Sequence, residues 1–255
     1  MNGFEKHGLS HVSPSQINMF SGCAGAWCAR YLFGRKFTFG VAPMVGTLAE
    51  DAVCQVILGE KELDEAIDDM YGKIHRRTLL QSLQSKDENR IDAARGMVEI
   101  AVEELKSYGM PKFADKPNYK GDYQIEIKLN CNGDGWSIPV TGFCDFVYPE
   151  HNLIIDLKTS MKAPSSMSAE HKRQGAIYAK AMGMDVKFLY VTGKKAVWHD
   201  VEDIDETLSE VKAILSRHEK FLRLDADVIR DIVPVNKGSF YWSDDLDVAR
   251  ELYGI

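Results

Sequence analysis

The chain has 255 residues, of which 45% are hydrophobic and 27% charged, and its formal net charge is −7. This balance is that of an ordinary globular protein, long enough for one large domain or two small ones. No apolar run approaches the ~18–20 residues that span a bilayer, and the opening MNGFEKHGLSHVSPSQ lacks the apolar region of a signal peptide. The net charge gives no global attraction to nucleic acid, but a local basic patch can still bind it.

The cysteines are odd in number, scattered along the chain, and form no Cys-x-x-Cys pair. This pattern favours a reducing cytoplasm, with buried thiols rather than disulfides or a zinc site. We therefore expect a cytoplasmic protein. The five residues are Cys23, Cys28, Cys54, Cys131 and Cys144.

Helices are predicted for the first 115 residues. Ser13 as N-cap, Pro14 at the first helical position and Gln16 closing a capping box predict that a helix begins at SPSQINMF. A second helix is predicted over residues 42–59. Between residues 61 and 108 the periodicity is helical and strongly charged, with breaks near MYGK and SKDENR, which fits two or three partly exposed helices.

Strands are predicted from about residue 120, where the composition changes. An alternating pattern followed by the turn signal NGDG predicts a hairpin, and PEHN predicts a second turn. The last helix is amphipathic, and Asp203 with Glu206 predicts its N-terminal cap. In chain order we predict strands over 123–131, 136–148 and 153–160, a helix over 168–183, strands over 187–193 and 196–202, and a helix over 203–224.

These elements together predict one α/β domain over residues 1–255, with a central mixed sheet flanked by helices. Residues 1–115 would be mainly helical, residues 120–200 would form the sheet and its helix, and residues 203–255 would add C-terminal helices. The sequence contains no repeat, low-complexity linker or long block of charge.

The stretch VTGFCDFVYPEHNLIIDLKTSMK contains two carboxylates and a lysine within otherwise apolar strands. If PEHN closes Tyr148 against Leu153, Asp145 lies opposite Asp156 on one face, with Cβ atoms ~4.5–5.5 Å apart. Lys158 shares this face because side chains alternate along a strand. Burying unpaired charges is unfavourable, so these residues require a partner, a metal or a reaction.

Two adjacent carboxylates repel, and a hard divalent cation is the usual remedy. Mg²⁺ favours carboxylate oxygens and keeps several waters that a substrate phosphate can replace. Lys158 could then orient a water nucleophile or stabilise charge on the phosphate. The alternative is a structural ion pair between Asp156 and Lys158, with Asp145 solvated nearby.

The helix over 168–183 supplies further candidates. Gln174 and Tyr178 are four residues apart and share one helical face. His171 and Arg173 lie in the preceding turn with another basic residue, where free helix amides also suit phosphate. Alternatively, Gln174 and Tyr178 form a polar edge of a core helix. For the basic turn alone, a solvated face is the better explanation.

Glu50 is a third candidate acid, because it shares a helical stripe with small and apolar residues. A carboxylate on such a stripe needs a partner, which a metal or a buried arginine would provide equally well. Asp51, beside Thr47 and Gln55, faces the other way. The residues of the stripe are Gly46, Val53, Cys54 and Ile57.

Five motifs, in this order, resemble those of the PD-(D/E)XK nuclease superfamily and specifically its RecB-type exonuclease branch. They are SPSQINMFSGCAGAWCARYLFG, GTLAEDAV, GFCDFV, IIDLKTS and QGAIY. The resemblance spans roughly Ser13 to Tyr190. It implies a restriction-endonuclease-like core and a metal-dependent nuclease that cuts DNA phosphodiesters.

The resemblance also implies roles for the candidate residues. Asp145, Asp156 and Glu50, with the main-chain carbonyl of Leu157, would hold one or two Mg²⁺ or Mn²⁺ ions, and Lys158 would position the attacking water. Gln174 and Tyr178 would organise the site and contact the substrate strand, and two serines would grip backbone phosphate. The substrate-binding candidates are Gln174, Tyr178, Ser13, Ser15, His171 and Arg173.

The chain departs from the family pattern in two respects. Many RecB-type relatives have histidine where Glu50 stands, although glutamate can still bind a hard metal. Relatives with an iron–sulfur cluster use one early cysteine and a late cysteine group, whereas no cysteine follows Cys144 here. We therefore predict a protein without an iron–sulfur cluster.

The function predicted from these residues is a DNA exonuclease of phage or bacterial recombination, repair or DNA processing. A DNA-end-binding module of the same fold and a sequence-specific endonuclease are the alternatives, and a protein-only scaffold leaves the hairpin charges unexplained. We expect DNA with ends as the partner and no membrane. The sequence fits single- or double-stranded DNA, either polarity of digestion, and one or two metal ions. It also fits a recombination protein partner or a homo-oligomer.

Overall fold

The computed structural model describes residues 2–38, 40–114, 124–130 and 136–255. The predicted turn at 132–135 and Cys131 lie outside the described residues. The elements are α1 (Gly3–Lys6), α2 (Pro14–Gly22), α3 (Ala24–Trp27), the π-helix η1 (Cys28–Leu32), α4 (Val41–Ile57), α5 (Leu63–Thr78), α6 (Ser85–Lys106), β1 (Ile125–Leu129), β2 (Val140–Cys144), β3 (Phe146–Tyr148), the 3-10 turn η2 (Pro149–His151), β4 (Leu153–Thr159), α7 (Ala169–Met182), β5 (Asp185–Val191), β6 (Ala196–Asp200), α8 (Ile204–Phe221), α9 (Ala226–Ile232), the 3-10 turn η3 (Phe240–Trp242) and α10 (Leu246–Tyr253).

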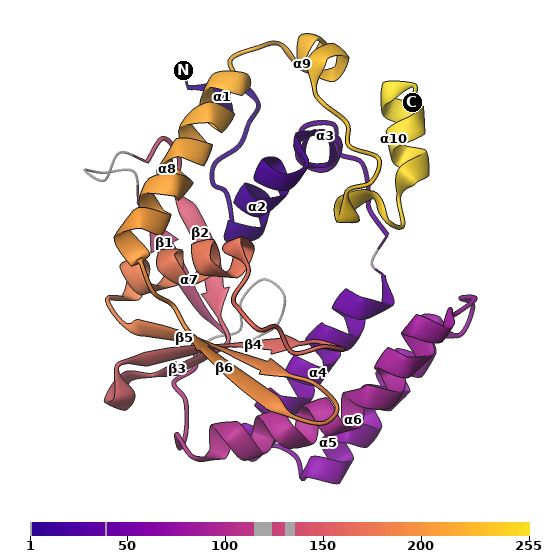
Figure 1. Ribbon diagram of the computed structural model, residues 1–255, viewed down its shortest axis with the longest axis vertical. Coiled ribbons are helices and arrows are strands. Elements are labelled where there is room, and N and C mark those ends of the chain that lie inside the picture. Colours follow the sequence, from indigo (N-terminus) through magenta and orange to yellow (C-terminus); the bar gives the residue numbers. More distant parts are fainter. Residues whose placement is uncertain (1, 39, 115–123, 131–135) are drawn as a thin grey trace.

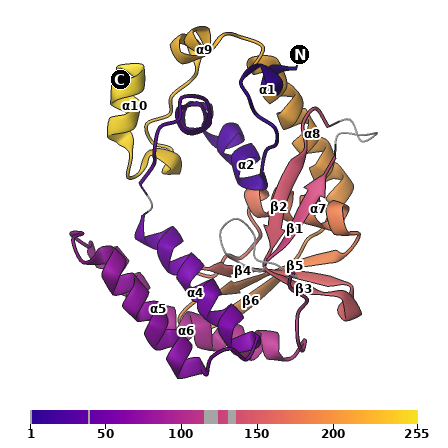
Figure 2. The same cartoon turned by 180° about the vertical axis from the view of Figure 1, so that it is seen from behind.

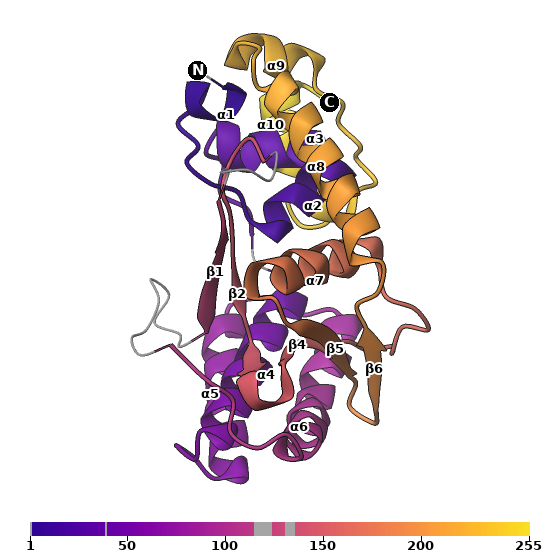
Figure 3. The same cartoon turned by 90° about the vertical axis from the view of Figure 1, so that its left-hand side faces the viewer.

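A four-stranded mixed sheet lies at the centre of the molecule (Figures 1 and 3). Its strand order is β3-β4-β5-β6, with β4 and β5 parallel and the two outer pairs antiparallel. Helices α4, α5 and α6 cover one face and α7 covers the other, while β1 and β2 form a separate antiparallel pair. The predicted α/β class with a mixed sheet flanked by helices is confirmed.

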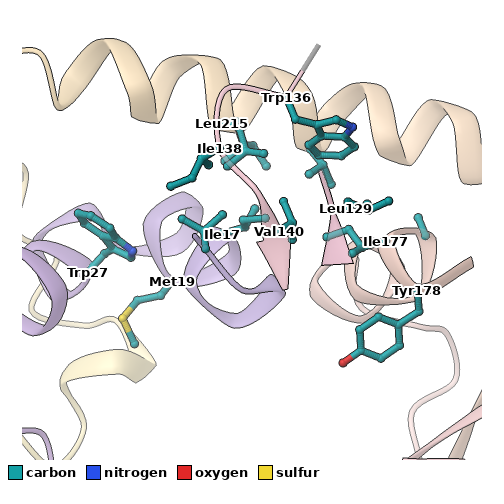
Figure 4. Packing of buried hydrophobic residues seen from close by; sticks show 14 of the residues in the cluster. Ile17, Met19, Trp27, Leu129, Trp136, Ile138, Val140, Ile177, Tyr178 and Leu215 are labelled. Atoms are coloured by element: carbon teal, nitrogen blue, oxygen red, sulfur yellow. The ribbon is translucent and has the colours of Figure 1, made fainter. Parts of the chain in front are cut away.

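Strand β4 separates two hydrophobic cores. Leu153, Ile155 and Leu157 belong to the core that contains α4, α5 and α6, whereas Ile154 belongs to the other. Because side chains alternate along a strand, Asp156 lies on the side of Ile154, away from the leucines. Figure 4 shows this second core, to which α2, β2, α7 and α8 contribute Ile17, Val140, Ile177 and Leu215.

The hairpin register is as predicted, with Phe146 opposite Ile155 and Tyr148 opposite Leu153. The single strand predicted over 136–148 is wrong, because it is broken at Asp145 into β2 and β3, which belong to different sheets. The break has a physical cause: the Asp145 side chain turns inward and accepts a hydrogen bond from the main-chain N–H of a residue on β4. Asp145 is therefore not a ladder partner of the residue predicted opposite it.

Three local predictions also need correction. Ser13 caps α2 by accepting a hydrogen bond from the Gln16 N–H, but the side-chain oxygen of Gln16 is buried without a partner among the described residues, so no capping box forms. Asp203 has a left-handed backbone (φ 53°) and makes no side-chain cap for α8. Residues 61–108 form two helices, since α5 continues through MYGK and the break falls just before SKDENR.

The C-terminal segment folds back onto the N-terminal helices (Figures 1 and 2). The Tyr253 hydroxyl donates to the Gly25 carbonyl at 2.7 Å. Both carboxylate oxygens of Asp245 accept from the Thr38 N–H, at 2.8 and 3.0 Å. Thr38 lies in the connection that joins the N-terminal helices to α4, so the C-terminal segment braces this connection.

The remaining features agree with the composition. Cys23, Cys28 and Cys144 are buried free thiols, as predicted. Within the described part of the chain, no helix is long and apolar enough to cross a membrane.

His218 of α8 is a buried, unpaired histidine within the second core. Its ring stacks on Phe20 with centroids 3.7 Å apart and meets Trp27 edge-on at 4.1 Å. Neither ring nitrogen has a hydrogen-bond partner among the described residues. Burial lowers the pKa of His218 to about 3, so the folded protein holds it neutral.

We predict that His218→Phe makes the protein less sensitive to acid. The folded pKa lies below the unfolded value of ~6.5, so stability is complete above pH ~6.5 and falls by up to ~1.4 kcal/mol per pH unit below it. The variant keeps an aromatic ring without this titration. The free energy of unfolding, measured by urea denaturation, is compared between variant and wild type. The difference, variant minus wild type, should be about 2–3 kcal/mol larger at pH 4.5 than at pH 7.

The matched control is His75→Gln, which replaces an exposed histidine of α5. Its difference from wild type should not depend on pH. A pH-independent difference for His218→Phe as well would contradict the assignment of acid sensitivity to His218.

Candidate active site

Three carboxylates from distant parts of the chain meet beside β4. Asp156 is fully buried and Asp145 is 7% exposed. Glu50 is half-buried and comes from α4. Close packing of α4 on β4 brings Glu50 here: one turn earlier, a Cβ on Gly46 would lie only 3.1 Å from the Thr159 hydroxyl.

Gln124 joins two of these carboxylates. Its side-chain Nε2 donates to Glu50 Oε1 and to Asp145 Oδ1, each at 2.7 Å. The partner of Glu50 is therefore an amide rather than the arginine considered as an alternative. The sequence analysis missed Gln124. Its only signal is its place on the polar face of the predicted strand, which it shares with Glu126 and Lys128.

Burial makes all three carboxylates easier to protonate. It raises the pKa of Asp145 to about 7, with a further contribution from Asp156. It raises the pKa of Glu50 well above its ordinary value, and Asp145 adds to the effect. It also raises the pKa of Asp156, although Lys158 opposes this. The site therefore carries an unfavourable concentration of negative charge, which a cation would relieve.

Lys158 is the positive charge of the site. Its Nζ pairs with Asp156 Oδ1 and lies 5.5 Å from the centroid of the Phe188 ring. Burial alone would lower the pKa of Lys158, but the carboxylates of Asp156 and Asp145 raise it, so the side chain is charged. The structural ion pair with a solvated Asp145 does not describe this site, because Asp145 is buried.

Helix α7 holds Asp156 in place through Gln174. The Gln174 Nε2 donates to Asp156 Oδ2 at 2.7 Å and to the Tyr178 hydroxyl at 3.0 Å. The Tyr178 hydroxyl donates to the Phe143 carbonyl at 2.7 Å. Tyr178 lies at the edge of the second core with its hydroxyl directed away from it (Figure 4). This chain ties α7, β4 and β2 together around the acids.

Gly142 explains why Tyr178 can come so close to β2. A Cβ at position 142 would lie 2.8 Å from a ring carbon of Tyr178, which is closer than carbon atoms pack. The glycine of the Gly-x-x-Asp motif therefore leaves room for a side chain of α7.

His171 and Arg173 are placed differently from the other candidates. The pKa of His171 is lowered to about 4 by burial and by nearby Lys158, and its Nδ1 shares a hydrogen bond with the Tyr190 hydroxyl at 2.6 Å. Arg173 is buried, where it donates to Asn18 and pairs with Glu210. A neutral histidine and a buried, paired arginine do not support direct binding of phosphate by either residue.

A cavity of about 1590 Å³ opens beside the acids. The hydroxyls of Ser13 and Ser15, at the N-terminus of α2, lie 2.8 Å apart at its wall. The cavity is also lined by Gln124, Lys158, Gln174 and Tyr178. Most of the predicted site residues therefore either line one cavity or bind a residue that does.

The donor set fits a hard divalent cation. Carboxylate oxygens are its preferred ligands, and the amide nitrogen of Gln124 already sits between two of them as a weaker positive partner. Among the described residues no three His, Cys, Asp or Glu side chains form a preassembled cage. Mg²⁺ needs none, because one or two carboxylates, waters and substrate phosphates usually complete its shell. That the main-chain carbonyl of Leu157 is a further metal ligand stays a prediction.

Comparison with known proteins places these residues in a family context. The chain matches the family described as "PD-(D/E)XK nuclease superfamily" over residues 11–241. A search of the curated proteins finds no match. Among solved structures, "Crystal structure of SSO0001" matches with 13% sequence identity and a TM-score of 0.34, over 84% of this chain and 89% of that chain. A similarity of that strength carries no argument about this chain.

We predict that Gly142→Ala destabilises the protein through Tyr178. The new methyl group must displace the ring or β2, at a cost of about 1–3 kcal/mol in the free energy of unfolding. In the double variant with Tyr178→Leu the obstacle is gone, so the double variant should lose less than the sum of the two single changes. Urea denaturation of the four proteins measures this. Strict additivity would show that the methyl group does not meet Tyr178.

We also predict that Asp145→Asn stabilises the protein in EDTA and abolishes its stabilisation by Mg²⁺. The folded pKa of about 7 lies above the unfolded ~3.9, so ionised Asp145 reduces stability as the pH rises through this range. At pH 8 the variant should be more stable than wild type by about 1–3 kcal/mol. Thermal unfolding with EDTA and with Mg²⁺ tests both parts.

The control is Glu126→Gln, which neutralises an exposed acid at the same cavity. It should keep the rise in Tm that Mg²⁺ gives to wild type. An equal rise in the Tm of the Asp145→Asn protein on adding Mg²⁺ would show that Asp145 is not a metal ligand.

Proposed function

Because the chain belongs to the PD-(D/E)XK nuclease superfamily, we propose that it is a divalent-metal-dependent deoxyribonuclease that hydrolyses phosphodiesters from DNA ends. The observation that carries this proposal is the meeting of Asp145, Asp156 and Glu50 around Lys158, which lines a large cavity. Two buried acids, the half-buried Glu50 and one lysine form a site suited to a cation and a phosphate in the same place.

The proposed roles follow from the contacts. Glu50, Asp145 and Asp156 hold one or two Mg²⁺ or Mn²⁺ ions, and the metal, when bound, supplies Lewis-acid stabilisation of the phosphate. Lys158 presents its ammonium at the cavity, where it orients water or stabilises charge on the phosphate. Gln174 would fix the orientation of the Asp156 carboxylate beside a bound metal.

Substrate contacts are proposed at the rim of the site. Ser13 and Ser15 open α2, where free backbone amides and hydroxyls suit a backbone phosphate. Tyr178 organises β2 beside the acids through its bond to the Phe143 carbonyl. His171 lines the cavity and is bonded to Tyr190, and Arg173 is bonded to Asn18 and Glu210, so both help to position α7. Their direct contact with DNA stays a prediction.

An exonuclease is favoured over the two alternatives. A binding module of the same fold would not need the complete set of acids and lysine that this chain retains. The ordered motifs support placing it in the RecB-type branch, with a role in phage or bacterial recombination or repair in the cytoplasm. A recombination protein or further copies of the chain are the proposed partners.

We predict metal-dependent release of nucleotides from end-labelled linear DNA. Wild type should digest linear DNA with Mg²⁺ or Mn²⁺, leave it intact in EDTA, and leave covalently closed circles uncut. Lys158→Ala should lower the rate by at least ~10²-fold, because it removes a charge that stabilises the transition state. Denaturing gels of substrates labelled at either end measure the rate and the polarity.

Arg230→Ala, which removes a half-exposed arginine of α9 that pairs with Asp227, is the matched control and should cut at the wild-type rate. Cutting of closed circles would identify an endonuclease instead. Intact DNA with both metals, in a protein that nevertheless binds DNA, would identify a binding module.

A further inference from the structure

We propose that the cavity binds one unpaired DNA strand, with Phe240 as a base-stacking contact and Lys86 and Arg90 as phosphate contacts. This inference rests on the proposed function, since it names the form of DNA that reaches the acids. The evidence comes from the enclosure of the cavity, from its charge balance and from three side chains at its wall.

The cavity is bordered on several sides by the chain itself. Its wall includes α2, α7, β2, the beginnings of α4 and α6, and the segment 240–245. The hydrogen bonds of Asp245 to the Thr38 N–H fasten the C-terminal segment to the connection between α2 and α4. In Figures 1 and 2 the N-terminal helices, this connection, α4 and the sheet follow one another around a ring.

The volume of the cavity suits a single strand. Groove depths of ~8.5 and ~7.5 Å make a B-form duplex more than ~16 Å across. At this width, 1590 Å³ holds only roughly two base pairs at ~3.4 Å each. An unpaired strand is narrower and has its bases free, so it fits such a volume more readily than a duplex does.

The charges of the wall are balanced, so phosphate attraction alone cannot hold a strand there. This balance gives more weight to contacts with the bases, which stack on aromatic side chains irrespective of sequence. The basic residues of the wall are Arg30, Lys86, Arg90, Lys128 and Lys158, and the acidic residues are Asp87, Glu126, Glu170, Asp244 and Asp245.

Phe240 is the aromatic ring best placed for such stacking. It is 75% exposed although it lines the cavity, and it is the only aromatic among the large apolar side chains that the described structure leaves exposed. Its turn, η3, is anchored by Trp242, which is 1% exposed and packs edge-on against Phe37 at 5.4 Å. The Tyr241 ring adjoins Phe240 at 5.9 Å. The anchored turn thus presents a largely exposed apolar ring to the cavity, with the Tyr241 ring beside it.

Lys86 and Arg90 are two of the cations of the wall. They are four residues apart on α6 and therefore share a face of the helix. Both line the cavity, and neither forms an ion pair within the described residues. Asp245, in contrast, is occupied by the Thr38 N–H, and Glu170 accepts from the Tyr241 hydroxyl at 3.4 Å. The basic pair is therefore available to a phosphate.

The test measures binding in a Lys158→Ala background, which keeps the DNA intact. Fluorescence anisotropy compares a 20-nucleotide single strand, an abasic strand of the same length and a blunt 20-base-pair duplex, all with Mg²⁺. Phe240→Ala should weaken binding of the single strand ~5–150-fold, because stacking contributes ~1–3 kcal/mol per base. Binding of the abasic strand should change less than twofold, and Phe240→Trp should restore the affinity.

The basic pair is tested by salt dependence. Lys86→Ala with Arg90→Ala should weaken the base-bearing and the abasic strand equally and reduce the slope of log Kd against log salt by about 1.4. Lys106→Ala, at the far end of α6, is the matched control and should leave the slope unchanged.

The outcomes separate this inference from the function on which it rests. Unchanged single-strand binding in Phe240→Ala, equal losses on both strands, or a duplex that binds as tightly as the single strand would each overturn the inference. The proposed function would survive those results as long as the Lys158-containing protein digests DNA ends. Absence of both binding and digestion would overturn the two together.

Discussion

The hydrogen bond from the Leu157 N–H to the Asp145 carboxylate, at 2.9 Å, is the constraint around which the rest of the molecule is arranged. A residue that continued the strand would point its side chain across the sheet and use its backbone in the ladder. Asp145 instead turns inward, so β2 leaves the main sheet to pair with β1 while β3 remains with β4. The same turn directs a second carboxylate at the place where Asp156 is already buried.

Such a site is unfavourable to fold by itself, and its surroundings show how the cost is offset. Burying a charge without a partner is unfavourable, and removing one member of a buried ion pair leaves the other buried without compensation. Lys158 forms an ion pair with one oxygen of Asp156, and Gln174 donates a hydrogen bond to the other. Gln124 donates to both Asp145 and Glu50. Apolar cores on both faces of β4 supply the general stability of the domain. The site can therefore keep excess negative charge for a ligand.

Local patterns were enough to predict most of the elements and the register of the central hairpin. The turn PEHN fixed the register of β3 against β4, and the spacing of Gln174 and Tyr178 placed both on one side of α7. The role of each residue as a catalytic or binding group stays a prediction that the experiments above address. What the sequence did not reveal depends on distant partners: the break at Asp145 requires Leu157, and the place of Gln124 requires Glu50, 74 residues earlier.

Arg173 shows that a local pattern can also suggest the wrong environment for a side chain. Near a helix N-terminus and beside two other basic residues, it has the local signature of a phosphate ligand. Its partners, Asn18 on α2 and Glu210 on α8, are 155 and 37 residues away, and they make it a brace between three helices. The sequence of the C-terminal segment also does not show that this segment packs against the connection before α4. That contact consists of one carboxylate, Asp245, and one backbone amide, that of Thr38.

The charge balance of the site accounts for glutamate at position 50. With all groups ionised, Glu50, Asp145 and Asp156 contribute −3 and Lys158 contributes +1, which leaves −2. One divalent cation neutralises this remainder, whereas a neutral histidine at position 50 would leave −1 and a soft nitrogen ligand. In the absence of a cation, the raised pKa values of the acids favour their protonated forms. Gln124 can share its amide between two carboxylates but adds no full charge, so the attraction of the site for a hard divalent ion remains.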